Sequence, residues 1–242
     1  MNAPLAQKMR PTVLQEVVGQ DHLVGPNGLL TRILEASAPL SILLWGPPGC
    51  GKTTIAHLYA KGFGVPCISL SAVDAKTTEI KKIVEKESSP LFRPLLFIDE
   101  IHRFNKAQQD LFLPYVEQGM ITLVGATTEN PSFALTSALL SRMRVLTLSP
   151  LSDEALVALI ARFKEVHPSV TPDDGAIERL VEMAQGDGRR LMNTLETLLT
   201  LEKGVVTKEV LSTLPSYTPP RYDRSGDRHF DLISSLHKSV RG

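Results

Sequence analysis

Apolar residues in the first 150 positions form short, uninterrupted runs that are separated by amphipathic segments. Runs without polar alternation are typical of parallel strands that are covered by helices on both faces. Five runs predict the strands, at residues 41–45, 65–69, 95–99, 121–126 and 144–148. Their alternation with amphipathic segments predicts an α/β fold, in which a parallel five-stranded sheet is flanked by helices.

The pattern changes after Pro150, where apolar residues recur at helical spacing and no strand-like run stands out. Three helices are predicted, at residues 152–166, 175–185 and 189–202. Asp153 and Asp174 are placed to contribute to two of the helix starts. We therefore expect a base domain over residues 1–150 and a small all-α lid domain over residues 151–215.

Residues 216–242 differ from both regions. The stretch 216–228 is polar and contains Pro219 and Pro220, which is typical of a linker. Apolar residues then return at helical spacing in 229–240, just before the sequence ends. We interpret this end as the start of a truncated helical domain.

Composition and charge exclude only a few classes of protein. A formal net charge of zero gives no support for nucleic-acid binding, although it allows a local basic patch. No apolar run is long enough to span a membrane, and the first residues lack the apolar core of a signal peptide. The two cysteines, Cys50 and Cys67, are too few for a disulfide framework, so we expect a cytoplasmic protein without membrane contact.

One segment fits the phosphate-loop pattern G-x-x-x-x-G-K-[ST] in full. It follows a predicted strand and precedes a helical segment that begins at Thr54, which is the context that the pattern requires. The loop residues are Gly46, Pro47, Pro48, Gly49, Cys50, Gly51, Lys52 and Thr53. Glycines let backbone N–H groups turn toward phosphates, and the following helix presents its positive end to them. The sequence therefore predicts an ATP site that includes Thr54, and a glycine-rich turn without a ligand is the disfavoured alternative.

Three side chains of this loop have specific expected roles. Lys52 should reach the β- and γ-phosphates of ATP, and the Thr53 hydroxyl should ligate Mg²⁺. Cys50 occupies a variable position of the pattern, so we expect it to serve packing rather than redox chemistry.

The predicted strand at 95–99 ends in two acids, Asp99 and Glu100. Ligands gather at the carboxyl ends of parallel strands, so Asp99 can hold Mg²⁺ through its water shell and Glu100 can activate the attacking water. Many strands end in a solvated acid, but the position about 50 residues after a phosphate loop favours catalysis. We expect His102 to be a solvated or hydrogen-bonded loop histidine, and Arg103 to face a neighbour or DNA.

Three further residues are candidates for sensing or stabilising the γ-phosphate. A predicted strand ends at Thr127-Thr128-Glu129-Asn130, where we favour Thr128 over Asn130, the alternative being a turn rich in capping residues. Arg142 precedes another strand and could act across a subunit interface, although taken alone a surface salt bridge is the better interpretation. Arg189 could fold back onto the nucleotide, or it could be a solvated arginine at a helix start.

These features, in this order, are similar to the AAA+ superfamily. More narrowly, the chain resembles the replication-associated recombination protein A family, whose eukaryotic relative is the Werner-helicase-interacting ATPase. The most specific matches are the sequences DEIHRFNKAQQD and GATTENPSF. Matching stretches lie at residues 4–11, 18–23, 45–49, 99–110, 125–133, 188–196 and 226–242. The resemblance covers nearly the whole sequence.

The resemblance implies roles for individual residues. It implies that the core ATPase residues are Lys52, Thr53, Asp99 and Glu100. It makes Thr128 the first sensor, Arg142 the finger supplied in trans and Arg189 the second sensor. The segment 17–23 would line the adenine pocket, chiefly through Val18 and Gly19.

The resemblance also implies a fold of ATPase base plus helical lid, and a DNA-stimulated ATPase. It implies action at duplex ends, single-strand/duplex junctions and stalled forks, in recombination and repair. It implies a cytoplasmic, nucleoid-associated location and the single-strand-binding protein as a partner. Family members continue into a further domain that makes a homo-oligomer, and the shorter length here suggests a truncated form.

Other functions share the same motifs. A clamp-loader subunit usually has cysteine after Ser-Arg, where this sequence has Met143, and a branch-migration motor tends to insert a hairpin where residues 108–118 predict a short helix. An ATP-gated scaffold with little hydrolysis is disfavoured because Glu100 is intact. DNA binding rests on the resemblance, since basic positions such as Lys81 and Lys82 on a predicted helix are typical of a solvated face.

Overall fold

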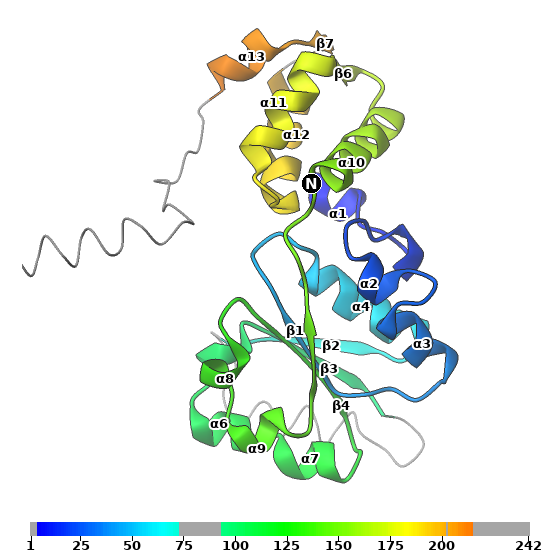
Figure 1. Ribbon diagram of the computed structural model, residues 1–242, viewed down its shortest axis with the longest axis vertical. Helices are drawn as coiled ribbons and strands as arrows, with labels where there is room; N and C mark the ends of the chain where they lie inside the picture. The colour runs from blue at the N-terminus through cyan, green and yellow to red at the C-terminus, as the bar shows by residue number, and fades with distance from the viewer. Residues whose placement is uncertain (1–3, 73–92, 202, 215–242) are drawn as a thin grey trace, which may run out of the picture.

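The computed structural model describes residues 4–72, 93–201 and 203–214. The predicted helix that carries Lys81 and Lys82, the predicted linker and the predicted helix at 229–240 lie outside the described residues. In the described part, a lower sheet-containing base is joined to an upper helical lid (Figure 1). No helix among these residues has the length and apolar character needed to cross a membrane.

The base is built on a parallel sheet with the strand order β2-β3-β4-β1-β5, so the predicted five-stranded parallel sheet is confirmed. The strands are β1 (Ile42–Trp45), β2 (Cys67–Ser71), β3 (Leu95–Asp99), β4 (Thr122–Thr127) and β5 (Arg144–Thr147). Four of these five strands differ from the prediction, by one or two residues at a boundary. The largest shift is at β2, because the Val65 N–H donates to Ala60 at the end of the preceding helix and Pro66 has no N–H.

Two helical layers cover the sheet. One face packs against α2 (Asp21–Val24), α3 (Leu29–Glu35) and α4 (Lys52–Gly62) in a core that includes the Ile42 and Leu44 side chains. The other face, which includes Leu43, packs against α6 (Lys106–Asp110), α7 (Leu113–Glu117), α8 (Pro131–Ala134) and α9 (Ser137–Leu140). Successive residues of β1 thus enter opposite cores, as the period of a strand requires.

The helix predicted at 108–118 is divided into α6 and α7. Asn105 and Gln108 begin α6 with a capping box, in which each side chain accepts from the other residue's backbone N–H. Pro114 lies in the first turn of α7, where its missing N–H costs least. The proline therefore favours a new helix start over continuation of the first helix.

The lid contains α10 (Asp153–Val166), α11 (Asp174–Ala184), α12 (Gly188–Leu201) and α13 (Lys208–Thr213). Ser152 and Asp173 cap α10 and α11, and the predicted contributors Asp153 and Asp174 are the first helical residues. The expectation of an all-α lid without strands was wrong, because β6 (Val170–Pro172) pairs in parallel with β7 (Gly204–Val206). Strands of three residues are too short to produce a recognisable pattern.

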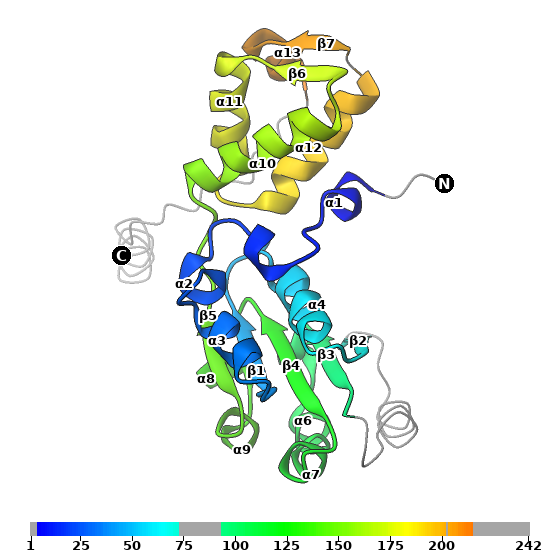
Figure 2. The same cartoon turned by 90° about the vertical axis from the view of Figure 1, so that its right-hand side faces the viewer.

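The N-terminal arm, residues 4–18, joins the two halves. Helix α1 (Leu5–Lys8) lies beside α12 of the lid (Figure 2). Leu5 and Met9 belong to the lid core, whereas Leu14 and Val17, in and after the short helix η1 (Leu14–Glu16), belong to the base core. The start of the chain therefore packs with the lid, although it was assigned with the base in the expected division at residue 150.

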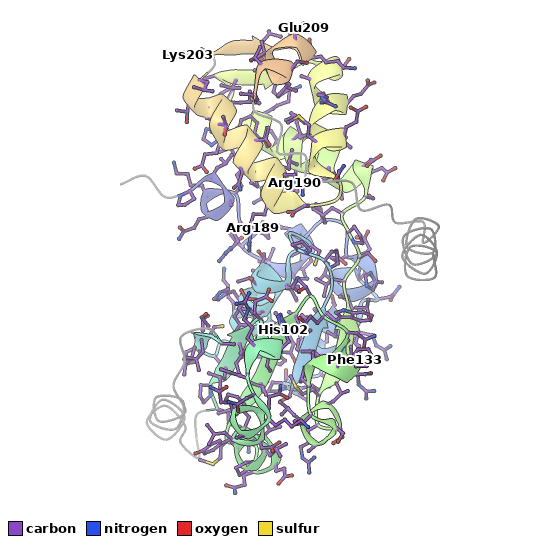
Figure 3. The ribbon with its side chains drawn as sticks, turned by 90° about the vertical axis from the view of Figure 1, so that its left-hand side faces the viewer. His102, Phe133, Arg189, Arg190, Lys203 and Glu209 are labelled. Atoms are coloured by element: carbon purple, nitrogen blue, oxygen red, sulfur yellow. The ribbon has the colours of Figure 1, made fainter. Side chains whose placement is uncertain are left out.

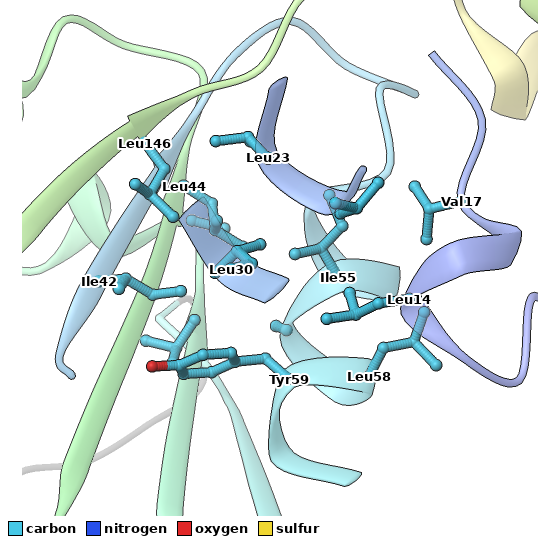
Figure 4. Close-up of a cluster of buried hydrophobic side chains, with 14 of the residues drawn as sticks. Leu14, Val17, Leu23, Leu30, Ile42, Leu44, Ile55, Leu58, Tyr59 and Leu146 are labelled. Atoms are coloured by element: carbon cyan, nitrogen blue, oxygen red, sulfur yellow. The ribbon is translucent and has the colours of Figure 1, made fainter. Parts of the chain in front are cut away.

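The base core contains one buried tyrosine hydroxyl. Tyr59 is fully buried on α4, and its hydroxyl accepts from the Leu40 N–H (2.9 Å) and donates to the Leu40 carbonyl (3.1 Å). Figure 4 shows Tyr59 packed among Ile42 and Leu58. This pair of hydrogen bonds fixes the chain just before β1, and therefore the strand that carries the phosphate loop.

We predict that Tyr59→Phe destabilises the protein by about 1–3 kcal/mol, because the Leu40 peptide groups lose their partner while the ring volume is kept. Urea unfolding followed by circular dichroism would measure the change. Tyr115→Phe is the matched control, because Tyr115 is only half-buried, and it should change stability by less than about 0.5 kcal/mol. Equal effects of the two substitutions would contradict the prediction.

Candidate functional site

The phosphate loop connects β1 to α4 and is shaped by two glycines with positive φ. Gly49 has φ of 70° and Gly51 has φ of 101°, values that side chains rarely allow. Lys52, the first residue of α4, is only 7% exposed. Its ammonium group donates to the carbonyls of Gly46 and Pro47, both at 2.8 Å. The loop thus encircles the lysine ammonium group at the N-terminus of a helix of eleven residues.

A cavity of about 360 Å³ lies between this loop, the carboxyl ends of β3 and β4, the N-terminal arm and the lid. Most of the predicted site residues line it, namely Val18, Pro48, Gly49, Cys50, Gly51, Lys52, Thr53, Thr54, Asp99, Glu100, Thr128 and Arg189. Gly46, Pro47, Gly19 and Arg142 do not line it. A cavity of this size at the carboxyl edge of a parallel sheet is suited to a small-molecule ligand.

The predicted residues outside the cavity have other contacts. Gly46 donates its N–H to Thr127 and accepts from Lys52, so it shapes the loop from behind. Gly19 has φ of 75° and lies so close to Leu151 that an added Cβ would be 2.9 Å from the leucine side chain. Gly19 therefore supports the cavity wall without forming it.

Sequence reasoning missed two cationic residues of the cavity, Arg10 and Arg162. Arg162 lies on α10 with its guanidinium 3.6 Å from the carboxylate of Glu16. With Lys52 and Arg189 they make four positive side chains around one cavity. Apolar side chains, including Val17, Leu159 and Met192, form another part of the wall. Cations and an apolar wall are what the phosphates and the base of a nucleotide require.

The acidic residues at the end of β3 line the same cavity as Thr53. The Asp99 carboxylate accepts the backbone N–H of Glu100 at 3.1 Å. A carboxylate and a hydroxyl are oxygen donors of the kind that Mg²⁺ takes, with water completing the shell. No cluster of three or more His, Cys, Asp or Glu groups suited to a metal is found in the described part of the chain. The carboxylate of Asp99 and the hydroxyl of Thr53 are oxygen donors that fit Mg²⁺.

The polar residues after β4 divide into two kinds. Thr128 is exposed and lines the cavity, as a sensor would require. Asn130 caps α8 by accepting the Ser132 N–H at 3.0 Å, so it corresponds to the capping alternative. His102 is hydrogen-bonded, as expected, and contacts the Thr127 hydroxyl at 2.9 Å.

Cys50 is 1% exposed, and burial raises the pKa of its thiol. Burial also raises the pKa of Cys67. A raised pKa lowers the thiolate fraction at neutral pH, and the thiolate is the reactive form. Both cysteines are therefore poorly suited to redox chemistry, in agreement with the packing role expected for Cys50.

Arg142 lies far from the cavity of its own chain. It lies between α9 and β5. The first residue of β5, Arg144, pairs with Ile42 at the amino end of β1, whereas the phosphate loop follows the carboxyl end of β1. Its guanidinium forms an ion pair with Glu117 and donates to the Ala138 carbonyl at 2.7 Å. Within one chain, Arg142 therefore makes the surface salt bridge that its immediate sequence favoured.

The lid touches the phosphate loop directly. The Gly188 N–H donates to the Gly49 carbonyl at 3.1 Å, and the Asp187 carboxylate caps α12 by accepting the N–H groups of Arg189 and Arg190. Figure 3 shows Arg189 at the end of the lid that faces the base, whereas Lys203 and Glu209 lie at the far end. The first turn of α12 is thus held against the loop.

Two family descriptions match the chain. "ATPase family associated with various cellular activities (AAA)" matches residues 42–151, and "AAA C-terminal domain" matches residues 166–241. Replication-associated recombination protein A of Escherichia coli K12 is 43% identical over 255 residues, which cover 99% of this chain and 57% of that protein. The ATPase WRNIP1 of Dictyostelium discoideum is 40% identical over 269 residues, covering 99% of this chain and 31% of that protein.

The chain belongs to the replication-associated recombination protein A family of AAA+ ATPases. It spans little more than half the length of its Escherichia coli relative. A solved structure of the same fold, the Thermotoga maritima RuvB Holliday junction branch migration motor, superposes with a TM-score of 0.71 at 30% identity. That match covers 84% of this chain and 71% of the other. The α/β base followed by a helical region is therefore confirmed as an AAA fold.

We predict that Gly49→Ala weakens ATP binding, because a Cβ at this position overlaps the Asp187 carboxylate and the φ of 70° is unfavourable for alanine. Titration with a fluorescent ATP analogue would measure the dissociation constant. Gly64→Ala is the matched control, since Gly64 has a similar φ of 66° but nothing within 4 Å of its Cβ position. Both substitutions should cost about 1 kcal/mol of stability from φ alone, and only Gly49→Ala should impair binding.

Proposed function

We propose that this protein is a DNA-dependent AAA+ ATPase that acts at stalled replication forks and in recombination and repair. The observation that carries the ATPase part is the convergence of the phosphate loop, the acidic end of β3, the end of β4 and the lid arginines on one cavity. The DNA-dependent part is supported by the family, in which the Escherichia coli relative is called a replication-associated recombination protein.

In this proposal Lys52 neutralises the β- and γ-phosphates, while Thr53 and Asp99 hold Mg²⁺. Bound Mg²⁺ would neutralise charge on the phosphates. Glu100 accepts a proton from the attacking water, and Thr128 and Arg189 contact the γ-phosphate. Val18 lies against the base of the nucleotide, and Gly19 supports that wall. Arg10 and Arg162 add positive charge to the same cavity.

Arg142 completes the proposed reaction from a neighbouring subunit, where it stabilises charge on the transferring phosphoryl group. The proposed partners are single-strand/duplex junctions and forked DNA, the single-strand-binding protein and further copies of the chain, in the cytoplasm at the nucleoid. A branch-migration role is less favoured, because the chain between β3 and β4 forms only η2 (Ile101–Arg103), α6 and α7, with no hairpin.

We predict that forked DNA raises the steady-state ATPase rate and that Glu100→Gln lowers this rate by about 10²-fold or more while ATP binding is kept. A coupled assay with and without forked duplex would measure the rates. Glu35→Gln, on the exposed side of α3, is the matched control and should leave turnover unchanged. Near-normal turnover in Glu100→Gln would remove Glu100 as the base. A DNA-insensitive rate would contradict the DNA-dependent part, and ATP binding without turnover would favour the scaffold alternative.

We predict that Arg142→Ala keeps ATP binding but lowers turnover by about 10³-fold, because an arginine supplied in trans stabilises the transition state. Loss of the exposed ion pair with Glu117 should cost less than about 1 kcal/mol of stability. Glu117→Gln, which removes only the partner, is the control. Mixing Arg142→Ala with Glu100→Gln should restore activity, since mixed assemblies contain sites with both an intact Glu100 and an intact Arg142. Unchanged rates in Arg142→Ala would support the salt-bridge role alone.

A further inference from the structure

His102 connects the ends of two neighbouring strands, β3 and β4, which border the cavity. It lies on η2 directly after β3, and its side chain is 11% exposed. Its Nδ1 is 2.9 Å from the Thr127 hydroxyl at the end of β4. Its Nε2 is 3.3 Å from the Glu100 carboxylate and 3.6 Å from that of Glu129. His102 itself does not line the cavity, but Glu100 does. Figure 3 shows His102 on the base, below the lid.

The hydrogen bonds around the imidazole indicate which nitrogen carries the proton. The Thr127 hydroxyl oxygen accepts the Glu129 N–H at 3.0 Å, and its own hydrogen is available for Nδ1 of His102. Nε2 faces two carboxylates, which can only accept when they are ionised. The arrangement is satisfied when Thr127 donates to Nδ1 and the Nε2–H donates toward Glu100.

The backbone of Glu100 also needs support. Its φ of 52° and ψ of 46° place it in the left-handed region, which costs a residue with a side chain about 1 kcal/mol or more. Such a conformation persists when its surroundings hold it, and here the Asp99 carboxylate holds the Glu100 N–H while His102 contacts its carboxylate. The backbone N–H and the side-chain carboxylate of Glu100 are therefore both held in place.

We propose that His102 is a positioning residue for Glu100, which it ties through Thr127 to the end of β4. The proposal rests on the role proposed for Glu100 as the base. His102 holds one oxygen of the Glu100 carboxylate and leaves the other free to accept a proton from water. Thr128, the neighbour of Thr127, lines the cavity, so a shift of this strand end on contact with a phosphate reaches Glu100 through a single side chain.

Kinetics of three variants test this role. His102→Ala and Thr127→Val should each lower kcat for ATP by about 10- to 100-fold, since small displacements of a reacting group have effects of this size. The dissociation constant for ATP should stay unchanged, because neither side chain lines the cavity. Thr127→Ser keeps the hydroxyl and should restore most of the rate. Equal losses of kcat in Thr127→Ser and Thr127→Val would overturn the proposal, as would a loss of ATP binding instead of kcat.

Two controls separate positioning from other effects. His167→Ala removes a histidine that follows α10 in the lid, packs against Phe163 and does not line the cavity, and it should leave kcat unchanged. Adding His102→Ala to Glu100→Gln should lower the rate no further, because His102 acts only through Glu100. An additional loss in the double variant would contradict this. Normal turnover of Glu100→Gln alone would instead refute the proposed base.

A measurement without turnover tests the hydrogen bonds directly. ¹⁵N NMR of the imidazole groups should show the Nε2–H form of His102 in the full chain, and Thr127→Val should change this signal while Thr127→Ser should not. An Nδ1–H form would overturn the proposal. If the chain binds ATP without hydrolysing it, this spectrum decides the question by itself.

Discussion

The backbones of Gly49 in the phosphate loop and Gly188 in the lid meet in a hydrogen bond of 3.1 Å. Glycine favours this approach on both sides, because a Cβ on Gly49 would overlap Asp187 and one on Gly188 would lie close to the Gly49 carbonyl, at 3.1 Å. Asp187 at the same place caps α12, and Arg189 follows it at the helix start. The contact therefore determines where the lid arginine lies relative to the loop. The loop at Gly49 and the first turn of α12 are in direct backbone contact, with no side chain between them.

Two other connections limit how the lid can sit on the base. Gln20 is fully buried, and its amide bonds both backbone groups of Ser149, at 2.8 and 3.1 Å, just before the lid begins. The N-terminal arm enters both cores, with Met9 in the lid core and Leu14 in the base core. Only a few residues separate these two anchors, and Arg10 among them lines the cavity. Rotation of the lid must therefore displace the arm, and with it one wall of the proposed nucleotide site.

The parts of this structure that could be predicted from sequence are those encoded by neighbouring residues. The predicted strands are short apolar runs, and the phosphate loop and the pair Asp99-Glu100 are local patterns next to strands. Each can be recognised because the residues that define it are adjacent in the sequence. Arg10 and Arg162 could not be found in this way, because an arginine on an amphipathic helix or in a loop looks the same whether it faces solvent or a cavity. The pairing of β6 with β7 joins residues 170 and 204, and depends on how α11 and α12 fold back. The His102 contacts similarly depend on the adjacency of β3 and β4, which a single sequence does not reveal.

The positions of the charged residues divide the proposed reaction between two places. Lys52 and Arg189 line the cavity beside the phosphate loop, so one chain can supply the groups that bind a nucleotide. Arg142 lies at the opposite edge of the sheet, where its ion pair with Glu117 and its hydrogen bond to the Ala138 carbonyl are exposed to solvent and hold it only weakly. An arginine that is weakly held at the surface is available to a neighbouring molecule at small energetic cost. In the proposed reaction, nucleotide binding therefore depends on the fold of one chain, whereas fast hydrolysis depends on a second copy that supplies Arg142.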